Sequence, residues 1–201
     1  MTLARPEQLV LASHNQGKIK ELQLLLEPLN INVLGLAELG LPAPEETGLS
    51  FVENAILKAR AASQASGLPA LADDSGLVVP ALKGEPGIYS ARYAGPEAND
   101  QRNYQLLLER MAGFTGIERQ AYFVCALAYV QHGQDPLPWL GQGQWPGEIV
   151  PPQGESGFGY DPVFYLPELQ QTAAQLDKVQ KAKLSHRGRA MEQLLAAWQS
   201  A

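Results

Sequence analysis

The sequence lacks the features that mark disulfide-stapled, secreted or membrane-spanning proteins. Cys125 is the single cysteine among 201 residues, so an internal disulfide is excluded. Its apolar flanks, AYFV and ALAYV, favour a small buried side chain over a nucleophile. No apolar run reaches the ~18 residues that span a bilayer, and MTLARPEQLV at the start does not have the charged head and long apolar body of a signal peptide. We therefore expect a soluble, cytoplasmic protein with no membrane partner.

The chain also lacks an excess of positive charge. Its formal net charge is -6, which argues against a general binder of nucleic acid. The exception is the segment 177–189, which contains five basic residues and one acidic residue. A local basic cluster on an acidic protein suits a small polyanion as ligand.

Two common phosphate-binding fingerprints are absent. Neither G-x-x-x-x-G-K-[ST] nor G-x-G-x-x-G occurs, so a P-loop mechanism is not available and a dinucleotide-binding oxidoreductase is excluded. The segment SHNQGK instead places small and polar residues between a buried strand and the start of a helix. Free backbone N–H groups there, with Lys18 in the first turn, form a candidate phosphate cradle. An ordinary strand-to-helix turn with an asparagine cap is the alternative.

Hydrophobic periodicity predicts an α/β protein. Residues 8–13 read as a buried strand, 18–29 as a helix with one apolar face, and 30–36 as the next strand. A hydrophobic content of 45% over 201 residues provides for a real core, and we expect one domain over 1–201 built from two closely joined lobes. Further helices are expected from about 99 to 111 and from 186 to 199, and strands over 119–131 and within 137–150.

The clearest helix covers residues 51–66. Ser50 and Glu53 form a capping box, and Gly67 is placed to end the helix. At 100° per residue, Lys58 and Asn54 lie at the edge of the inward apolar stripe, so Lys58 points toward the protein. The alternative is a lysine whose stem lies along apolar surface while its ammonium reaches water.

The last predicted helix aims a charge inward at its N-terminus. Arg187 projects onto the same stripe as the apolar residues that follow it, beside His186. Because a helix N-terminus is itself partly positive, this placement favours a bound anion or a carbonyl oxygen. An arginine paired with a structural carboxylate is the alternative.

The segment LADDSGL carries two adjacent carboxylates. We expect ALA and LVV to be short strands joined by a DDSG turn. Neighbouring residues of an extended chain point to opposite sides, so one of Asp73 and Asp74 enters a site while the other caps the turn. With a second carboxylate from Glu45 or Glu46, this arrangement suits Mg²⁺. An acidic hairpin tip without a metal is the alternative.

GFGYDPVF, residues 157–164, combines glycines that let backbone approach a ligand with aromatic rings and a carboxylate. An aromatic ring can stack on a nucleobase, which stabilises binding by ~1–3 kcal/mol. Taken alone the motif is weak, because glycine and aromatic residues are also common in β-turns.

Together the motifs resemble the inosine triphosphate pyrophosphatase family, whose bacterial branch is the nearest likeness. The blocks SHNQGK, EETGLSFVENAILKA, ADDSGL, GEPGIYSARYAG, GFGYDPVF and SHRG occur in the family's order and spacing. The resemblance implies a long mixed β-sheet flanked by helices, with two lobes and a cleft between them. It also implies a Mg²⁺-dependent hydrolase of ITP, dITP and XTP that yields the monophosphate and pyrophosphate, and a homodimer.

The resemblance further assigns roles to residues of this chain. Asp74 would be the general base and a metal contact, with Glu45 or Glu46 as the companion carboxylate. Ser75 would contact the substrate. Residues that would hold the triphosphate or add positive charge around it are Ser13, His14, Asn15, Gln16, Gly17, Lys18, Lys58 and Lys181. Residues that would bind the base are Phe158, Gly159, Tyr160, Asp161, His186 and Arg187.

Chemistry adds two expectations to these roles. Cations around Asp74 would lower the pKa of its carboxyl group, so that its use as a base would depend on positioning and on the metal. His186 and Arg187 donate hydrogen bonds, which suits the six-oxygen of hypoxanthine or xanthine and opposes the six-amino group of adenine. A Maf-type nucleotide pyrophosphatase and a nucleotide-binding module without hydrolysis are the competing hypotheses.

Overall fold

The computed structural model describes residues 5–199, which form a seven-stranded sheet with the strand order β2-β1-β3-β4-β5-β6-β7. β1 pairs in parallel with β2 and with β3, whereas β6 pairs antiparallel with β5 and β7. The sheet is therefore mixed, as predicted. The strands are β1 (Gln8–Leu11), β2 (Asn32–Gly35), β3 (Ala70–Val78), β4 (Gln120–Val130), β5 (Trp139–Ile149), β6 (Phe164–Leu166) and β7 (Gln171–Thr172).

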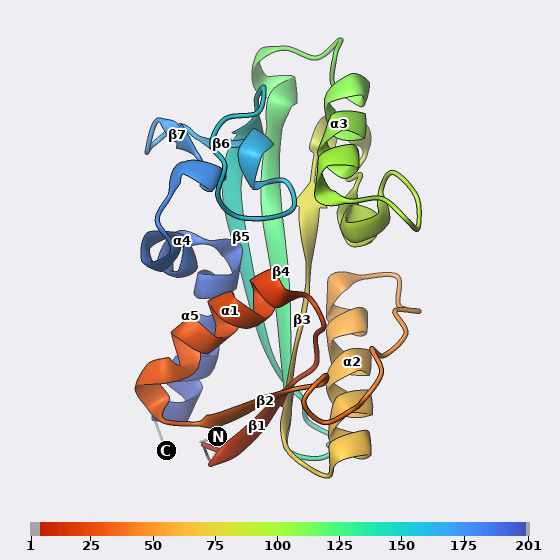
Figure 1. Ribbon diagram of the computed structural model, residues 1–201, viewed down its shortest axis with the longest axis vertical. Coiled ribbons are helices and arrows are strands. Elements are labelled where there is room, and N and C mark those ends of the chain that lie inside the picture. Colours follow the sequence, from red (N-terminus) through yellow and green to blue (C-terminus); the bar gives the residue numbers. More distant parts are fainter. Residues whose placement is uncertain (1–4, 200–201) are drawn as a thin grey trace. The chain divides into compact units, whose positions relative to one another are not determined.

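Helices flank the sheet, which confirms the predicted α/β class (Figure 1). The α-helices are α1 (Gln16–Leu26), α2 (Phe51–Ser66), α3 (Asp100–Arg110), α4 (Lys178–Leu184) and α5 (His186–Gln199). Short 3-10 helices are η1 (Glu27–Leu29), η2 (Pro80–Leu82), η3 (Gly87–Arg92), η4 (Gly116–Arg119), η5 (Asp161–Val163) and η6 (Ala173–Gln175). Among the residues described, no helix is both long and apolar enough to cross a bilayer.

The chain folds into two compact units. Of the described residues, unit 1 contains 5–74, 125–143 and 186–199, and unit 2 contains 75–124 and 144–185. β3, β4 and β5 each contribute residues to both units. A single domain with two lobes stays a prediction.

In unit 1, successive residues of the strands pack on opposite faces of the sheet. Leu9 and Leu11 of β1 join a core cluster with α1 and α5, whereas Val10 joins a second cluster with α2. Figure 1 shows α1 and α5 on one side of these strands and α2 on the other. β3 continues the pattern, because Leu71 belongs to the first cluster and Ala72 to the second.

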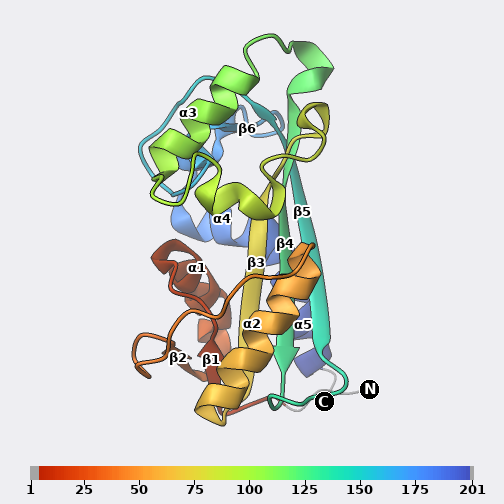
Figure 2. The ribbon, with the colours of Figure 1, turned by 90° about the vertical axis from the view of Figure 1, so that its right-hand side faces the viewer.

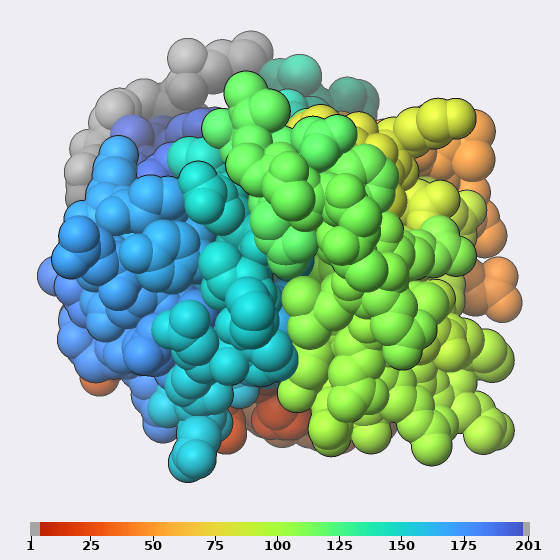
Figure 3. All heavy atoms as spheres, turned by 90° about the horizontal axis from the view of Figure 1, so that it is seen from above, coloured from red at the N-terminus to blue at the C-terminus, as the bar shows by residue number. Residues whose placement is uncertain are grey.

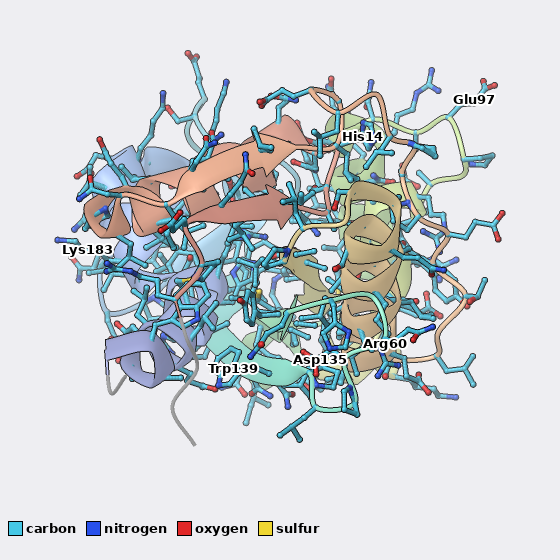
Figure 4. The ribbon with its side chains drawn as sticks, turned by 90° about the horizontal axis from the view of Figure 1, so that it is seen from below. His14, Arg60, Glu97, Asp135, Trp139 and Lys183 are labelled. Carbon is cyan, nitrogen blue, oxygen red and sulfur yellow. The ribbon has the colours of Figure 1, made fainter. Side chains whose placement is uncertain are left out.

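The predicted N-cap of α2 is confirmed, but the capping box is incomplete, because the Glu53 carboxylate accepts from Leu49 N and from the Ser50 hydroxyl rather than from Ser50 N. The Ser50 hydroxyl accepts a hydrogen bond from the backbone of Glu53, and Gly67 ends the helix in the left-handed region at φ 72°. Figure 2 shows α2 running beside β3. α2 is also held by Arg60, whose Nη2 donates a hydrogen bond to the carbonyl oxygen of Asp135 at 3.0 Å. Figure 4 labels both residues. α2 is thus fixed at its cap and along its length.

Unit 2 has its own core. It combines apolar side chains of β4, β5 and β6 with Leu107 and Met111 from α3 and its C-cap. Figure 3 shows one surface of this unit, where α3 (green) and the segments after β5 (cyan and blue) carry the exposed atoms. The α3 prediction is confirmed, with Asn99 as its N-cap. α4 and the short strands β6 and β7 were not predicted from the sequence.

One prediction about local structure is wrong. DDSG is not a turn between two short strands, because β3 runs without interruption from Ala70 to Val78. Aspartate and glycine are poor strand formers, but here each carboxylate is satisfied by partners from helices on the two faces of the sheet. Tertiary ion pairs outweigh the local preference for a turn.

Candidate functional site

Asp73 and Asp74 lie back to back on β3. Strand alternation sends Asp73 to the face of α1 and α5 and Asp74 to the face of α2. This confirms that the two carboxylates enter different surroundings. The expectation that the second one caps a turn is wrong, since both meet side chains that are distant in the sequence.

Asp73 is a buried carboxylate of unit 1 that contacts three side chains. Lys18 Nζ lies 2.7 Å from its Oδ1, and Arg187 Nε donates to its Oδ2 at 2.7 Å. Cys125 Sγ also donates to Oδ2, at 3.1 Å. Burial opposes ionisation of Asp73, but the two cations outweigh it and hold the pKa of its carboxyl group well below the usual value. Asp73 is therefore a permanently charged anchor for Lys18 and Arg187.

Arg187 is 1% exposed and is engaged by two carboxylates, since its Nη1 also pairs with Glu21 of α1. The alternative of a structural ion pair is thus realised, and α5 is joined through it to α1 and β3. His186, the first residue of α5, is buried as well, at 5% exposed. Burial raises the pKa of the Cys125 thiol well above its ordinary value, which fits the predicted non-nucleophilic role.

Asp74 meets a second set of partners in unit 1. Lys58 Nζ donates to its Oδ1 at 2.6 Å and to Glu46 Oε1 at 2.9 Å. The ammonium therefore stands between two carboxylates. Lys58 is 6% exposed, which confirms that it points inward. Of Glu45 and Glu46, it is Glu46 whose carboxylate contacts the ammonium that Asp74 also binds.

The pKa of Asp74 differs from the expectation. Burial is the largest influence and raises it to about 6, against the lowering effects of Lys58 and Lys18, while Glu46 adds to the rise. The expected lowering is wrong, because desolvation of a carboxylate that is 5% exposed outweighs the neighbouring cations. Burial alone would lower the pKa of the Lys58 ammonium, but the two carboxylates raise it overall. A carboxylate with a pKa near 6 is a competent base at neutral pH.

The SHNQGK segment forms the β1–α1 turn. Asn15 is the N-cap of α1, and its side-chain oxygen accepts from the backbone N–H of Lys18 at 3.1 Å. Ser13 Oγ accepts from Asn15 N at 3.1 Å, and His14 Nε2 donates to the carbonyl oxygen of Leu41 at 3.2 Å. The asparagine cap is therefore present. Gln16 and Gly17 occupy the first turn, where N–H groups face outward along the axis. His14 and the loop around it are visible in Figure 4.

Unit 2 assembles the GFGYD motif around Asp161. Asp161 Oδ2 accepts from the backbone N–H of Phe158 at 2.8 Å and pairs with Lys181 Nζ at 2.5 Å. The Lys181 ammonium lies 4.4 Å from the centre of the Phe158 ring. Lys181 thus joins Asp161 and Phe158. The ring of Phe158 is half-buried.

The rest of this loop is held by residues that precede it in the sequence. Gly159 N donates to Asp100 Oδ2 at 2.6 Å, and the buried hydroxyl of Tyr160 donates to the carbonyl oxygen of Ser90 at 2.8 Å. Ser75 follows Asp74 on β3 and is half-buried. The hydrogen bonds of Gly159 and Tyr160 therefore hold the loop that carries the Phe158 ring.

Three residues at the site were missed from the sequence as partners. They are Asp73 as the hub for two cations, Glu21 as the partner of Arg187, and Asn54, which contacts Asp74. Glu21 had a readable signal, because it lies three residues after Lys18 and so shares its helical face. Asn54 had one too, since it lies one turn before Lys58 on the same edge of α2.

The pair formed by Asp74 and Glu46 fits Mg²⁺. Within residues 5–199 no three His, Cys, Asp or Glu side chains gather closely enough to bind a metal ion by themselves. Mg²⁺ does not require such a cage, since it is commonly held by one or two carboxylates together with substrate phosphates and water. Two carboxylates that share one ammonium already accept a cation between them.

Comparisons with known proteins cover nearly the whole chain. Residues 9–197 match the Ham1 family. A dITP/XTP pyrophosphatase of Legionella pneumophila (strain Lens) is 57% identical over 94% of this chain and 97% of its own length. One from Yersinia pestis is 52% identical over 97% of this chain and 100% of its own length.

Solved structures agree with these matches. A HAM1 protein from Coxiella burnetii superimposes with a TM-score of 0.88 at 48% identity, covering 96% of this chain and 99% of that one. The Ham1 protein of Staphylococcus aureus gives a TM-score of 0.84 at 44% identity, over 96% and 98% of the two chains. The resemblance drawn from the motifs is confirmed, and the chain belongs to the Ham1 family.

Proposed function

We propose that this protein hydrolyses deaminated purine nucleoside triphosphates, namely ITP, dITP and XTP, to the monophosphate and pyrophosphate, and so removes them from the nucleotide pool. The observation that carries the proposal is the convergence of Asp74, Glu46 and Lys58 in unit 1. Its contacts supply a base, a two-carboxylate cation site and a positive charge. The names of the relatives, dITP/XTP pyrophosphatases, support the same reaction.

The proposed reaction is attack of water on the α-phosphorus. Asp74 accepts a proton from the attacking water while the new P–O bond forms. The bond from the α-phosphorus to the α,β-bridging oxygen breaks, and its electron pair leaves with pyrophosphate. A raised pKa makes Asp74 a better proton acceptor than an exposed aspartate.

Mg²⁺ bound by Asp74 and Glu46 would neutralise phosphate charge and favour ionisation of a nearby water. Lys58 would then be drawn toward phosphate oxygens, which compete for the same ammonium. Lys18, together with the first-turn N–H groups of Gln16 and Gly17, is proposed to bind the triphosphate. Asp73 limits how far the Lys18 ammonium can move, since it holds that group at 2.7 Å.

Recognition of the base is proposed to rest on two kinds of contact. Phe158 would stack on the purine, and Asp161 and Lys181 hold the loop that carries the ring. His186 and Arg187 would donate to the six-oxygen, which adenine lacks. Ser75 remains a proposed substrate contact, and Lys181 is proposed to add positive charge near the triphosphate. Because Nε and Nη1 of Arg187 both donate to carboxylates, the orientation of its guanidinium is fixed before the substrate binds.

We further propose that the protein acts as a homodimer in the cytoplasm. The assembly follows from the family likeness, and sedimentation equilibrium checks it directly. A mass of twice 21.8 kDa is expected, and a single-chain mass at micromolar concentration would contradict the proposal.

The test of the function is product analysis with a panel of nucleotides. Purified protein with Mg²⁺ should convert dITP, ITP and XTP to monophosphate and pyrophosphate in equal amounts, with dATP turned over at least a hundredfold more slowly, because a donor facing donors costs about 3 kcal/mol when buried. Release of single phosphate, or equal rates for dATP, would contradict it.

The same panel separates the competing hypotheses. A Maf-type pyrophosphatase prefers other nucleotides, and the Ham1 family match disfavours it. A binding module without hydrolysis would bind dITP and release no product. No contact in the described residues favours either of these over a Ham1-type hydrolase.

A further inference from the structure

Asn54 is a buried polar residue that the proposed reaction does not use. It lies on α2 one turn before Lys58, and 1% of it is exposed. Its side-chain oxygen Oδ1 accepts a hydrogen bond from the backbone N–H of Gly48 at 2.8 Å. Its Nδ2 donates to Asp74 Oδ2 across a longer distance of 3.4 Å. One short side chain therefore links residues 41–48, the acidic loop that contains Glu45 and Glu46, to the carboxylate proposed as the base.

The acidic loop needs such a link, because residues 41–48 form neither helix nor strand. The loop returns to α2 through Gly48 N and through Leu49 N, which donates to Glu53 Oε2 at 2.8 Å. Gly48 lies two residues after Glu46, so the position of its backbone limits where the Glu46 carboxylate can reach. The loop is fixed where it meets Asn54.

The approach at Gly48 is too close for any other residue. A Cβ built there would lie 2.8 Å from Asn54 Oδ1 and 2.7 Å from Glu53 Cβ. Glycine is needed here for space, since its backbone comes within hydrogen-bonding distance of the asparagine. The two residues form a matched contact that sets the distance between loop and helix.

Only a carboxamide satisfies both neighbours of Asn54. The backbone N–H needs an acceptor and the Asp74 carboxylate needs a donor, and asparagine presents one of each at opposite ends of a short planar group. Lys58 attracts both Glu46 and Asp74, but its flexible stem does not fix their separation. The rigid spacer between the loop and Asp74 is Asn54.

We propose that Asn54 is a positioning residue that holds Glu46 and Asp74 at the separation that a divalent cation requires. This inference rests on the proposed function, in which these two carboxylates bind Mg²⁺. It predicts that loss of the carboxamide weakens metal binding first and affects the nucleotide only through the metal. Groups that orient metal ligands change metal affinity by about 10–100-fold when removed.

The test compares Asn54→Leu, which keeps the number and branching of the side-chain heavy atoms and removes both hydrogen bonds, with the unaltered chain. Mg²⁺ binding is measured by calorimetry with the protein saturated by α,β-methylene dITP, which is not hydrolysed. We expect the dissociation constant of Mg²⁺ to rise by about tenfold or more. The Mg²⁺ concentration for half-maximal turnover should rise by the same factor, while KM for dITP at saturating Mg²⁺ stays within about twofold.

Asn103 provides a matched control. It is 2% exposed on α3, its Oδ1 accepts from Ala94 N at 2.8 Å, and its Nδ2 donates to the carbonyl oxygen of Ala91 at 3.1 Å. Asn103→Leu removes a bridge of the same kind in unit 2. It should lower the unfolding temperature to a similar extent and leave the Mg²⁺ dissociation constant unchanged. An equal rise in both variants would reduce the effect of Asn54 to general destabilisation and overturn the inference.

A second variant covers the case in which Asn54→Leu does not fold. Gly48→Ala keeps the Asn54 carboxamide and forces the loop away from Asn54 Oδ1, so it should weaken Mg²⁺ binding in the same direction. Unchanged Mg²⁺ affinity in a folded Asn54→Leu or Gly48→Ala variant overturns the inference and leaves the proposed function standing. A wild-type chain that binds Mg²⁺ without hydrolysing dITP contradicts the proposed function, while the affinity comparison still decides the role of Asn54.

Discussion

At the scale of single residues, Asp74 shows how burial prepares a carboxylate for proton transfer. Its pKa of about 6 comes from desolvation that two nearby lysines do not fully offset. Asp73, its neighbour, has a lowered pKa because Arg187 and Lys18 together outweigh a similar burial. The two faces of β3 thus give adjacent aspartates different surroundings, which suit Asp73 as an anchor and Asp74 as the proposed base.

The first prediction concerns Asp74→Asn. The amide cannot accept the proton from water, so kcat should fall by at least a thousandfold. Binding of α,β-methylene dITP, measured by calorimetry with Mg²⁺ at saturating concentration, should weaken by less than tenfold. Glu97→Gln, which changes an exposed carboxylate of unit 2 that has no proposed role, is the comparison of like charge. Loss of binding in proportion to turnover would remove the role of Asp74 as base.

The pH dependence follows from the same group. The base must be ionised, so kcat/KM at low Mg²⁺ should fall about tenfold per pH unit below an inflection near 6. The contribution of Asp74 to the free energy of unfolding changes with pH in the opposite direction. Because the folded pKa is raised above its ordinary value of 3.8, the contribution of Asp74 to the free energy of unfolding is full below that value and is lost as pH rises through about 6.

Metal and proton compete for Asp74, so raising the Mg²⁺ concentration should move the inflection in kcat/KM to lower pH. The measurement is a set of pH profiles at several Mg²⁺ concentrations. An inflection that does not move would show that the titrating group is not a metal contact.

At the scale of elements, sequence periodicity predicted β1, α1, α2, α3 and α5 together with their apolar faces. Caps explain this success, since Ser50, Asn99 and Gly67 set helix ends by local hydrogen bonds and backbone conformation. The turn predicted at 73–76 was wrong because β3 is stabilised by ion pairs that arrive from distant segments. α4 was missed, since only seven residues form it and three of them are lysines, which leaves a short apolar pattern.

The candidate site was predictable as a set of residue types and not as a set of contacts. The motif resemblance selected Lys18, Lys58, Asp74 and Arg187, which the structure gathers in unit 1. Pairings such as Arg187 with Glu21 depend on the packing of α5 against α1. Local periodicity places each residue on a face but does not state which helix will cover that face.

Packing of α5 against β5 leads to a prediction at this scale. A Cβ at Gly143 would lie 2.0 Å from the carbonyl oxygen of His186, at the first residue of α5. Backbone must move, so Gly143→Ala should lower the free energy of unfolding by about 1–3 kcal/mol. It should also reduce kcat/KM for dITP, because Arg187 belongs to the displaced turn.

Urea unfolding and steady-state kinetics measure the two effects of Gly143→Ala. Gly113→Ala is the control, since nothing lies within 4 Å of a Cβ at that exposed position. Equal stability of the two variants would show that α5 does not pack against β5 as described.

At the scale of the whole molecule, the net charge is -6, but the charges that cluster in unit 1 are nearly balanced. In unit 1, three cations (Lys18, Lys58 and Arg187) are paired with four carboxylates (Asp73, Asp74, Glu21 and Glu46). With all of them ionised, the cluster has a net charge of about -1, which repels a triphosphate. One Mg²⁺ makes the same cluster positive.

Metal and nucleotide should therefore bind with positive coupling. The dissociation constant of α,β-methylene dITP should fall by tenfold or more when Mg²⁺ is added, and by linkage the nucleotide should tighten Mg²⁺ binding by the same factor. Calorimetric titrations in both orders test this reciprocity. Independence of the two ligands would contradict the shared site.

In the proposed reaction, water attacks the α-phosphorus of a deaminated purine triphosphate. Hydrolysis of dITP in water enriched with oxygen-18, followed by mass spectrometry of both products, tests the point of attack. We expect one labelled oxygen in dIMP and none in pyrophosphate. Label in pyrophosphate would place the attack on the β-phosphorus and contradict the proposed reaction.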